Sequence, residues 1–167
     1  MWPRPKYCTR WWPNGGERTG SDGYPGRMAT IFTRIIDGEI PGTFVWRDEH
    51  CVAFLSINPL RPGHTLVVPR EEVDHWIDCP QELRDHLVGV SQAIGRAIDQ
   101  VHRPTKVGLM IAGLEVPHLH IHIVPIDGVR DLDFANAAPS IGREELQGEA
   151  ASLRAALTEM GAAGVSD

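Results

Sequence analysis

VPHLHIHIV, at residues 116–124, is the stretch of sequence that decides the fold. Because side chains alternate between the two faces of a strand, a strand over 118–124 places His118, His120 and His122 on one face. The apolar side chains between them then pack on the other face, against a helix. The chain has only eight histidines in 167 residues, and solvent-facing positions usually carry Lys, Glu or Thr. The histidine row is therefore expected to line a functional cleft, and a chance polar face is the less favoured interpretation.

Three imidazoles in a row could bind either a metal ion or a phosphate group. Two histidines two residues apart can chelate zinc, but the Cα atoms of His118 and His122 lie about 13 Å apart at a rise of ~3.3 Å per residue. The sequence offers no obvious group of Cys or acidic residues to complete a metal site. No metal and no cofactor is therefore expected, and a two-histidine metal site is kept as the alternative.

A phosphate suits the spacing of the row better. The pKa of histidine is near 6.5, so at neutral pH His120 is partly neutral and can attack phosphorus as a nucleophile. His118 and His122, on either side, can position the phosphoryl oxygens and spread their charge. The row therefore predicts catalysis at a phosphorus centre.

Periodicity outside this stretch predicts an α+β fold. Apolar runs joined mostly by short turns predict five strands, at 44–46, 51–55, 64–68, 107–112 and 118–124. A short helix is expected over 31–36 with Thr30 as its N-cap, and apolar positions three and four apart predict a long helix that starts at Pro80. A further helix is expected over 144–160, followed by a tail that frays from Gly161. Because the strands cluster and one long helix interrupts them, the sheet is expected to be antiparallel.

Length and composition favour one folded domain. A chain of 167 residues, 42% hydrophobic and 23% charged, fits one ordinary core. The net charge of −6 argues against a nucleic-acid partner, and no apolar run approaches the length of a membrane span. Cys8, Cys51 and Cys79 are odd in number and widely spaced, which argues against a disulfide framework and favours the reducing cytoplasm.

Residues 1–27 have the character of an irregular extension to a domain that spans 28–167. They contain three tryptophans, four prolines and five glycines, and their five basic and two acidic residues give a net charge of +3. No helical or strand period runs through them. We hypothesise that Met28 starts the folded domain and is the true translation start. The alternative is an ordered arm that docks on a partner through its tryptophans.

The histidine row belongs to a longer set of matches to one known family. Residues 118–124 fit the signature His-φ-His-φ-His-φ-φ, in which φ is an apolar residue. Upstream, TIFTRIIDGEIP at 30–41, AFLSINP at 53–59 and GHTLVVP at 63–69 fit three further blocks in the same order. Over residues 28–126 the chain thus resembles the histidine-triad (HIT) family of nucleotide hydrolases and transferases.

The resemblance implies a HIT-like fold, in which an antiparallel sheet of about five strands has a long central helix and a short N-terminal helix, usually in a homodimer. HIT proteins act on the α-phosphate of purine nucleotides, so His120 would be the nucleophile and form a nucleotidyl-histidine intermediate that water resolves. His118 and His122 would orient and stabilise, and His64 would lie near the phosphate. An apolar slot would hold the base, although each of its members could equally be ordinary core: Ile31, Phe32, Ile35, Phe54, Ile57 and Leu66.

Several positions depart from the HIT pattern and concern the substrate. Ser56 stands where many members have an aspartate for the ribose, and Leu114 stands where they have a glutamine. Val107 and Leu109 replace the usual Asn-x-Gly. Glu115 replaces a serine or threonine near the leaving group, where it could act as a general acid or repel an anionic leaving group.

Thr30 and Thr33 replace the Cys-x-x-Cys through which some members hold a structural zinc ion, so no such zinc is expected here. Two further features have no catalytic role in this interpretation. His75 and Trp76 are expected to pack at the rim of the pocket, and His86 is expected to be solvated on the long helix.

The leading hypothesis is therefore an enzyme, a cytoplasmic nucleotidyl hydrolase or transferase of the phosphoramidase type. Its model substrates are AMP–amine or AMP–lysine conjugates and dinucleoside polyphosphates. The second hypothesis, motivated by Ser56 and Leu114, is a nucleotide-binding sensor or partner protein with little turnover. The third is a metalloprotein that uses two of the three histidines.

Overall fold

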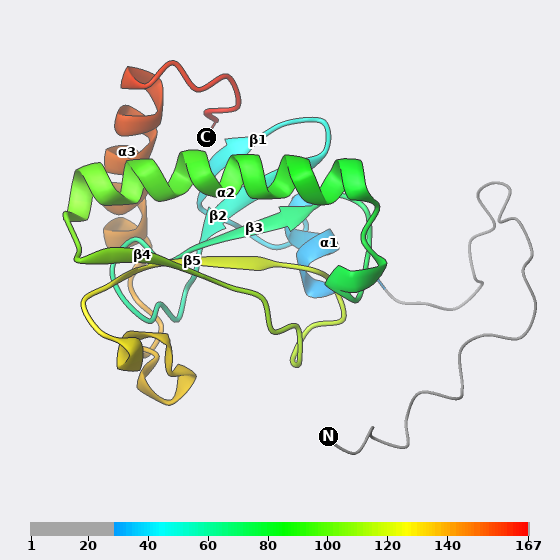
Figure 1. Ribbon diagram of the computed structural model, residues 1–167, viewed down its shortest axis with the longest axis horizontal. Helices are drawn as coiled ribbons and strands as arrows, with labels where there is room; N and C mark the ends of the chain where they lie inside the picture. The colour runs from blue at the N-terminus through cyan, green and yellow to red at the C-terminus, as the bar shows by residue number, and fades with distance from the viewer. Residues whose placement is uncertain (1–28, 167) are drawn as a thin grey trace, which may run out of the picture.

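Five strands form one antiparallel sheet, in the order β1-β2-β3-β5-β4, in the computed structural model, which describes residues 29–166 (Figure 1). The strands are β1 Phe44–Arg47, β2 Cys51–Leu55, β3 Thr65–Pro69, β4 Lys106–Met110 and β5 Ile121–Ile126. Together with the helices described below, the sheet confirms the predicted α+β class. The extension predicted over 1–27 and the hypothesis about Met28 lie outside the described residues.

Strand β5 begins three residues later than the sequence predicted. The ladder between β3 and β5 ends at the pair of Val67 and Ile121. Beyond that pair, β3 reaches Pro69, which has no N–H to donate to a continuing ladder. The chain ahead of β5 bonds elsewhere, since the Leu119 N–H donates to the carbonyl oxygen of Val73. Two of the three histidines therefore lie in the chain that leads into the strand.

The helices begin close to where the sequence predicted them. Helix α1, Ile31–Ile36, follows Thr30, whose side chain accepts a hydrogen bond from the Thr33 N–H at 3.1 Å. Helix α2, Gln81–His102, starts immediately after Pro80, and α3, Arg143–Glu159, is the predicted C-terminal helix. Buried apolar side chains recur along α2 at a spacing of three and four, which gives the helix one apolar face: Leu87, Val90, Ile94, Ala97 and Ile98.

The helices are divided between the two faces of the sheet (Figure 1). Helices α2 and α3 cover one face and form the main core with it. Leu119, Ile121 and Ile123 point into this core, as the alternation of the histidine stretch predicted. Helix α1 packs on the opposite face in a smaller cluster: Phe32, Phe44, Val52, Phe54, Leu66 and Val68.

The tail after α3 lies against β1 and does not fray from Gly161 as the sequence predicted. The Arg47 N–H donates to the carbonyl oxygen of Gly164 at 2.8 Å, and Trp46 pairs with Val165. Gly164 permits this approach, because a Cβ atom there would lie 2.2 Å from the Trp46 ring. Contact with a large indole therefore holds the tail in place.

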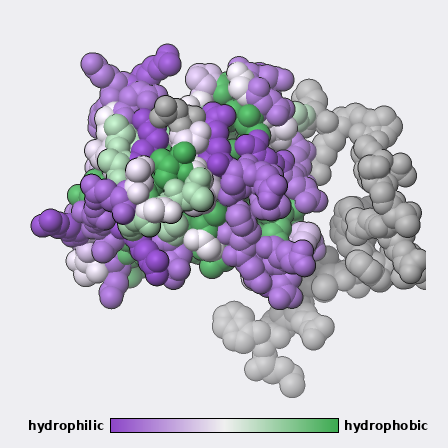
Figure 2. Space-filling view, turned by 90° about the horizontal axis from the view of Figure 1, so that it is seen from above, coloured by the Kyte–Doolittle hydropathy of each residue, from purple (hydrophilic) through white to green (hydrophobic). Residues whose placement is uncertain are grey.

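Residues 127–142 connect β5 to α3 and contain two short 3-10 helices, η2 Val129–Leu132 and η3 Phe134–Asn136. In Figure 1 this segment is drawn in yellow to orange below the sheet. The surface seen from above that view is mostly hydrophilic, with hydrophobic patches between the hydrophilic side chains (Figure 2). Among residues 29–166, no helix combines the length and the apolar character that crossing a membrane requires.

Candidate active site

The three histidines lie in one row beside Phe32 of α1. The ring centroids of His120 and His122 are 4.8 Å apart, and the Phe32 ring lies 4.9 Å from His120 and 5.9 Å from His118. All three imidazoles are buried within the chain. Strand β5 carries His122, and the chain leading into it carries the other two. The structure thus brings together the residues that the sequence selected.

Both ring nitrogens of His118 are bonded to the protein. Nε2 lies 2.8 Å from the carbonyl oxygen of Pro69, which can only accept, so Nε2 carries the proton. In the neutral ring, Nδ1 then accepts a hydrogen bond from the Thr30 hydroxyl at 2.7 Å. The ring is fully buried and both of its nitrogens form hydrogen bonds within the protein. Its contribution is therefore to position the chain around it.

Glu72 extends this network, and the sequence analysis missed it. Its carboxylate accepts hydrogen bonds from the Thr30 N–H, at 3.0 Å, and from the Thr33 hydroxyl. The start of α1 is thereby tied to the Thr30 hydroxyl that holds His118. No local pattern marks Glu72, because its partners are 42 and 39 residues away along the chain.

His120 directs an unprotonated nitrogen away from the backbone. Its Nδ1 lies 2.7 Å from the carbonyl oxygen of His118, so Nδ1 donates and Nε2 holds the lone pair. Burial lowers the pKa of His120, although the bond to the His118 carbonyl and the charge of Glu115 oppose this shift. At pH 7 the neutral ring is therefore favoured, which is the form that can act as a nucleophile.

A chain of hydrogen bonds fixes the tautomer of His122. The Leu60 backbone N–H donates to His64 Nδ1 at 3.1 Å, so His64 carries its proton on Nε2 and donates it to His122 Nδ1 at 2.9 Å. His122 consequently carries its own proton on Nε2 and is a donor there. Burial lowers the pKa of His64 to about 4 and that of His122 to about 3, and neighbouring imidazoles add to both shifts. Both rings are neutral at pH 7.

Two cavities, of about 160 and 150 Å³, are lined by His120. The loop after β4, at residues 112–114, lines both of them. His75 and Trp76 line the first cavity, in keeping with the pocket rim expected for them. The second cavity adds Glu115, His122 and Phe134.

Phe134 is a second residue that the sequence analysis missed. It belongs to η3, and its ring lies edge-on to His122, with centroids 5.2 Å apart and planes inclined by 70°. Nothing in the local sequence marks it, because the end of β5 and a stretch of turns and short helices separate it from the histidine row. Only the three-dimensional course of the 127–142 segment brings it to the site.

The residues predicted to form the base slot are brought together in part. Phe32, Phe54 and Leu66 pack in the smaller core cluster, with Ile35 half-buried against it. These four side chains therefore also have the ordinary core role that the sequence analysis kept open.

The remaining slot residues are more open to solvent. Ile31 and Ile57 are 48% and 59% exposed, as expected of side chains that a ligand could cover. Ser56 lines a different cavity, between the β2–β3 connection and α3, to which His64 also contributes. The two cavities at His120 do not include Ser56.

Comparison with known proteins settles the family. Residues 37–129, more than half of the chain, match the family model described as HIT domain. The chain belongs to the HIT family. It is 41% identical over 100 residues to an uncharacterised HIT-like protein of Methanocaldococcus jannaschii. The match covers 57% of this chain and 77% of that protein. Protein hit of Bacillus subtilis is 36% identical over 106 residues, covering 60% of this chain and 73% of its own.

Solved HIT structures share the fold. A HIT-like protein from Bartonella henselae superposes with a TM-score of 0.68 at 29% identity, covering 76% of this chain and 95% of that one. A zinc-bound histidine triad family protein from Mycobacterium smegmatis gives 0.67 at 28% identity, covering 78% and 94%. The five-stranded sheet and its helices are thus the HIT fold.

In this HIT protein, threonine hydroxyls occupy the two positions at which the family resemblance places zinc-binding cysteines. The Thr33 N–H donates to the Thr30 hydroxyl, the Thr30 hydroxyl donates to His118, and the Thr33 hydroxyl donates to Glu72. Hydroxyls lack the soft thiolate character that structural zinc sites favour. The same space is therefore organised by hydrogen bonds among the described residues.

A separate group of potential metal ligands lies at the β1–β2 turn. Donor atoms of Asp48, Cys51 and His86 lie within 4.8 Å of one another. The Asp48 carboxylate accepts hydrogen bonds from Trp46 Nε1 at 2.7 Å and from two backbone N–H groups, and His86 Nε2 lies 2.9 Å away. These donors account for the geometry as a hydrogen-bonded turn. The prediction that His86 is solvated was wrong, because its side chain is half-buried and forms a hydrogen bond with Asp48.

Proposed function

We propose that this HIT protein hydrolyses or transfers the nucleotidyl group of a purine nucleotide conjugate, by attack of His120 on the α-phosphorus. One observation carries the proposal. The His118 carbonyl oxygen holds the proton of His120 on Nδ1, and the lone pair on Nε2 belongs to a ring that lines two cavities. The proposed substrates are adenosine phosphoramidates, with dinucleoside polyphosphates as the other class.

The reaction has two steps. In the first, the His120 Nε2 lone pair forms a bond to phosphorus while the bond to the leaving group breaks, and the leaving group keeps that electron pair and takes a proton from solvent. In the second, water adds to phosphorus and loses a proton to solvent, while the bond to Nε2 breaks. The products are the nucleoside monophosphate and the free leaving group, and His120 is regenerated.

The neighbouring histidines have different roles in supporting His120. His122 offers its Nε2–H to a phosphoryl oxygen, and its neutral state places this donor without a charged ring. His64 holds that tautomer through the 2.9 Å bond to His122, and His118 positions His120 through its carbonyl oxygen. A preorganised donor of this kind stabilises the charge that grows on the transferred group. Phe32, Ile31 and the other slot residues would hold the base.

The test is steady-state hydrolysis of adenosine 5′-phosphoramidate by the wild type and by His120→Ala. Diadenosine triphosphate and tetraphosphate are assayed in parallel. We expect His120→Ala to lower kcat by about a thousandfold or more, as removal of a nucleophile does. His50→Ala is the matched control, because it removes a histidine that lies outside the row and is expected to change kcat less than twofold.

Two outcomes would contradict the proposal. Tight AMP binding by a wild type that turns over none of these substrates would favour the nucleotide sensor. A stoichiometric metal ion bound through the histidine row, found by elemental analysis of tag-free protein, would favour the metalloprotein.

We further propose that the protein is a homodimer that pairs through β4 and α2. Strand β4 ends the sheet, and Leu109 on it is 51% exposed. An open groove between this strand and α2 is lined by Val88, Gly95 and Val107 among others. An edge strand whose outer side has no partner strand, beside apolar side chains, is a surface that a second copy can cover. Sedimentation should give twice the chain mass for the wild type and the monomer mass for Leu109→Glu, and a monomeric wild type would contradict this part.

The proposal includes a reducing, cytoplasmic setting. Cys51 and Cys79 are free thiols buried in the fold. A reducing compartment preserves such thiols.

A further inference from the structure

A cavity that the proposed reaction does not use lies between the β2–β3 connection and α3, and we call it the α3 cavity. Its walls come from residues 55–64, from the end of the 127–142 segment and from the first two turns of α3. Among the described residues, none lines both the α3 cavity and either of the two cavities at His120. The α3 cavity is therefore a separate space.

The depth of the α3 cavity is apolar. Four of its apolar side chains are buried and two are half-buried: Leu55, Pro59, Leu60, Leu146, Ala138 and Ile141. Its volume of about 150 Å³ is close to that of an engineered apolar cavity that binds benzene. The α3 cavity thus has room for one six-membered ring or a short alkyl chain.

Backbone hydrogen bonds hold two of the walls together. The Ala138 N–H donates to the carbonyl oxygen of Pro59 at 2.9 Å, and the Ile141 N–H donates to that of Ile57 at 3.1 Å. These bonds tie the 127–142 segment to the β2–β3 connection, so the space between them does not depend on side-chain packing alone. Sites for small molecules are usually preformed in this way.

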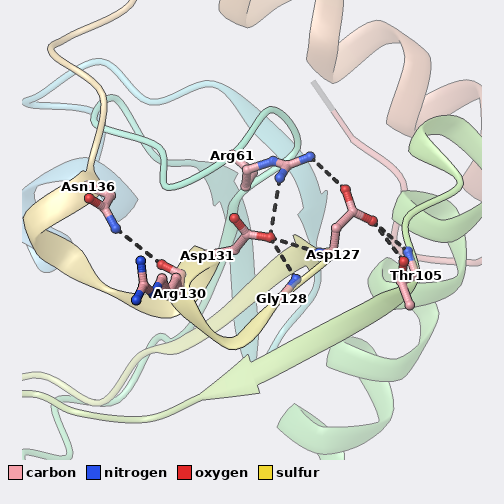
Figure 3. Close-up of polar contacts among 7 residues, drawn as sticks. All are labelled: Arg61, Thr105, Asp127, Gly128, Arg130, Asp131 and Asn136. Carbon is pink, nitrogen blue, oxygen red and sulfur yellow. Dashed lines mark hydrogen bonds and ion pairs between the residues drawn. The ribbon is translucent and has the colours of Figure 1, made fainter.

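Arg61 lines the α3 cavity, but its charge is already paired (Figure 3). The guanidinium donates to Asp127 at 3.1 Å and to Asp131 at 3.2 Å. Asp127 also accepts from the Thr105 N–H and hydroxyl, and Asp131 accepts from the Gly128 N–H, so both carboxylates are held in place. An anion in the α3 cavity would therefore compete with two carboxylates for this guanidinium.

Two carboxylates one helical turn apart, Glu145 and Glu149 of α3, complete the lining. Glu149 Oε1 lies 2.6 Å from His102 Nε2, so this carboxylate has a partner. Glu145 is exposed, and its side chain has no hydrogen bond or ion pair with the described residues. The open charge at the mouth of the α3 cavity is therefore negative.

The α3 cavity reaches the histidine row through His64. The ring of His64 lines the α3 cavity and donates to His122 at 2.9 Å, and His122 lines the second cavity at His120. Leu60, whose N–H donates to His64, lines the α3 cavity as well. An occupant would thus contact both residues that fix the tautomer of His122.

We infer that the α3 cavity is a second ligand site, which takes a small primary amine with a ring or a short alkyl chain as its body. The body would fill the apolar depth, and the ammonium group would lie at the mouth beside Glu145. This order of parts favours a free small molecule over a lysine side chain, because a lysine enters a cavity with its ammonium group first. A carboxylate ligand would meet the like charge of Glu145.

The experiment measures the dissociation constants of three probes of similar size with the full chain at low ionic strength: benzylammonium, benzyl alcohol and benzoate. We expect benzylammonium to bind with a constant of about 1 mM or below, which is within reach of eight non-hydrogen atoms. It should bind about threefold more tightly than benzyl alcohol, as one exposed charge pair allows, and benzoate should bind more weakly than the alcohol. Equal constants for all three probes would overturn the inference.

Two variants test the role of Glu145. In Glu145→Gln, the ratio of the constant for benzyl alcohol to that for benzylammonium should fall to near one. Glu144→Gln is the matched control, because Glu144 is an exposed neighbour on α3 outside the lining, and the ratio should stay at about three. An equal fall in both variants would overturn the inference, since it would show a general effect of charge.

Three further variants test where the probes bind. Ala138→Leu fills the α3 cavity and should weaken benzylammonium binding at least tenfold. Ile141→Ala enlarges the α3 cavity and should favour 2-naphthylmethylammonium over benzylammonium, which gives an answer if Ala138→Leu does not fold. His120→Ala alters only the catalytic cavities and should leave the constant unchanged. Weaker binding to His120→Ala, or unchanged binding to a folded Ala138→Leu, would overturn the inference.

The histidine ring signals in NMR spectra locate the occupant without any variant. Benzylammonium should shift the imidazole signals of His64 and, through the hydrogen bond, those of His122. The signals of His50, which lies at the β1–β2 turn, should not move. Shifts confined to His120 would place the probe in the catalytic cavities and overturn the inference. Because none of these measurements needs turnover, the inference and the proposed function are tested separately.

Discussion

The Glu72→Ala variant tests how far the histidine row depends on a residue that lies outside the row. Glu72→Ala removes the acceptor for the Thr30 N–H and the Thr33 hydroxyl, which frees the start of α1 and loosens the Thr30 bond to His118. We expect kcat for adenosine 5′-phosphoramidate to fall about tenfold, as loss of a supporting partner does, with KM changed less than threefold. Steady-state kinetics measures both constants.

Glu72→Gln and Glu71→Ala are the comparisons for this prediction. The glutamine keeps one side-chain oxygen that can accept the same two hydrogen bonds, so it should restore most of kcat. Glu71 is the exposed neighbour, and its loss should leave both constants unchanged. A fall in kcat that is equal in all three variants would show that Glu72 does not position the row.

At the residue scale, the sequence predicted the parts of the site that lie close together in the chain. The spacing of two selected His118, His120 and His122, and the chain that leads into β5 keeps them in one row although only His122 lies in the strand. Glu72 and Phe134 could not be predicted in this way, because contacts between distant segments bring them to the row. Their side chains are of common types, and only the folded chain gives them partners.

At the scale of elements, Gly164 fixes how the tail meets β1. A Cβ atom at this position would lie 2.2 Å from the Trp46 ring, so Gly164→Ala forces the indole or the tail to move. We expect the free energy of unfolding to fall by about 1–3 kcal/mol, the usual cost of overpacking. Gly148→Ala is the control, because it adds a methyl group in open space within α3 and should stabilise the helix slightly. Thermal or urea unfolding measures both, and equal stability of Gly164→Ala and wild type would contradict the prediction.

The elements themselves were predicted well where a repeating pattern specifies them. The start of α2 and both ends of α3 were predicted to within a residue, and Thr30 marked the start of α1 through its capping hydroxyl. The start of β5 was misplaced because strand length depends on the partner, and β3 ends at Pro69. The tail beyond Gly161 was misjudged because tertiary contacts hold it, with Trp46 and Arg47 of β1, and no local pattern marks such contacts.

At the scale of the whole molecule, the buried neutral histidines make stability depend on pH. His64 and His122 have folded-state pKa values of about 4 and about 3, below the unfolded value near 6.5. Between these values the unfolded chain binds more protons, so the free energy of unfolding falls as pH decreases from about 6.5 toward 4. From pH 7.5 to pH 5 the loss should be about 2 kcal/mol for each histidine.

Urea unfolding at the two pH values measures this loss. His122→Asn is the comparison, because its amide does not titrate and its oxygen can still accept from His64. Its free energy of unfolding should change less between pH 7.5 and 5 than that of the wild type. The carboxyls of Asp127 and Asp131, whose pKa values are lowered by backbone hydrogen bonds and by Arg61, contribute only below about pH 4. An equal pH dependence in variant and wild type would refute the assignment of this loss to His122.

The bond from the Leu60 N–H to His64 has a consequence for how this site tolerates sequence change. The donor belongs to the peptide backbone, so it carries no titratable proton and does not depend on which side chain stands at position 60. Substitutions there can alter packing, but nineteen of the twenty amino acids would keep the same direction of donation along the relay to His122. Proline alone lacks the hydrogen, and it would leave the relay free to reverse, which would turn the His122 nitrogen that we propose as a donor into an acceptor.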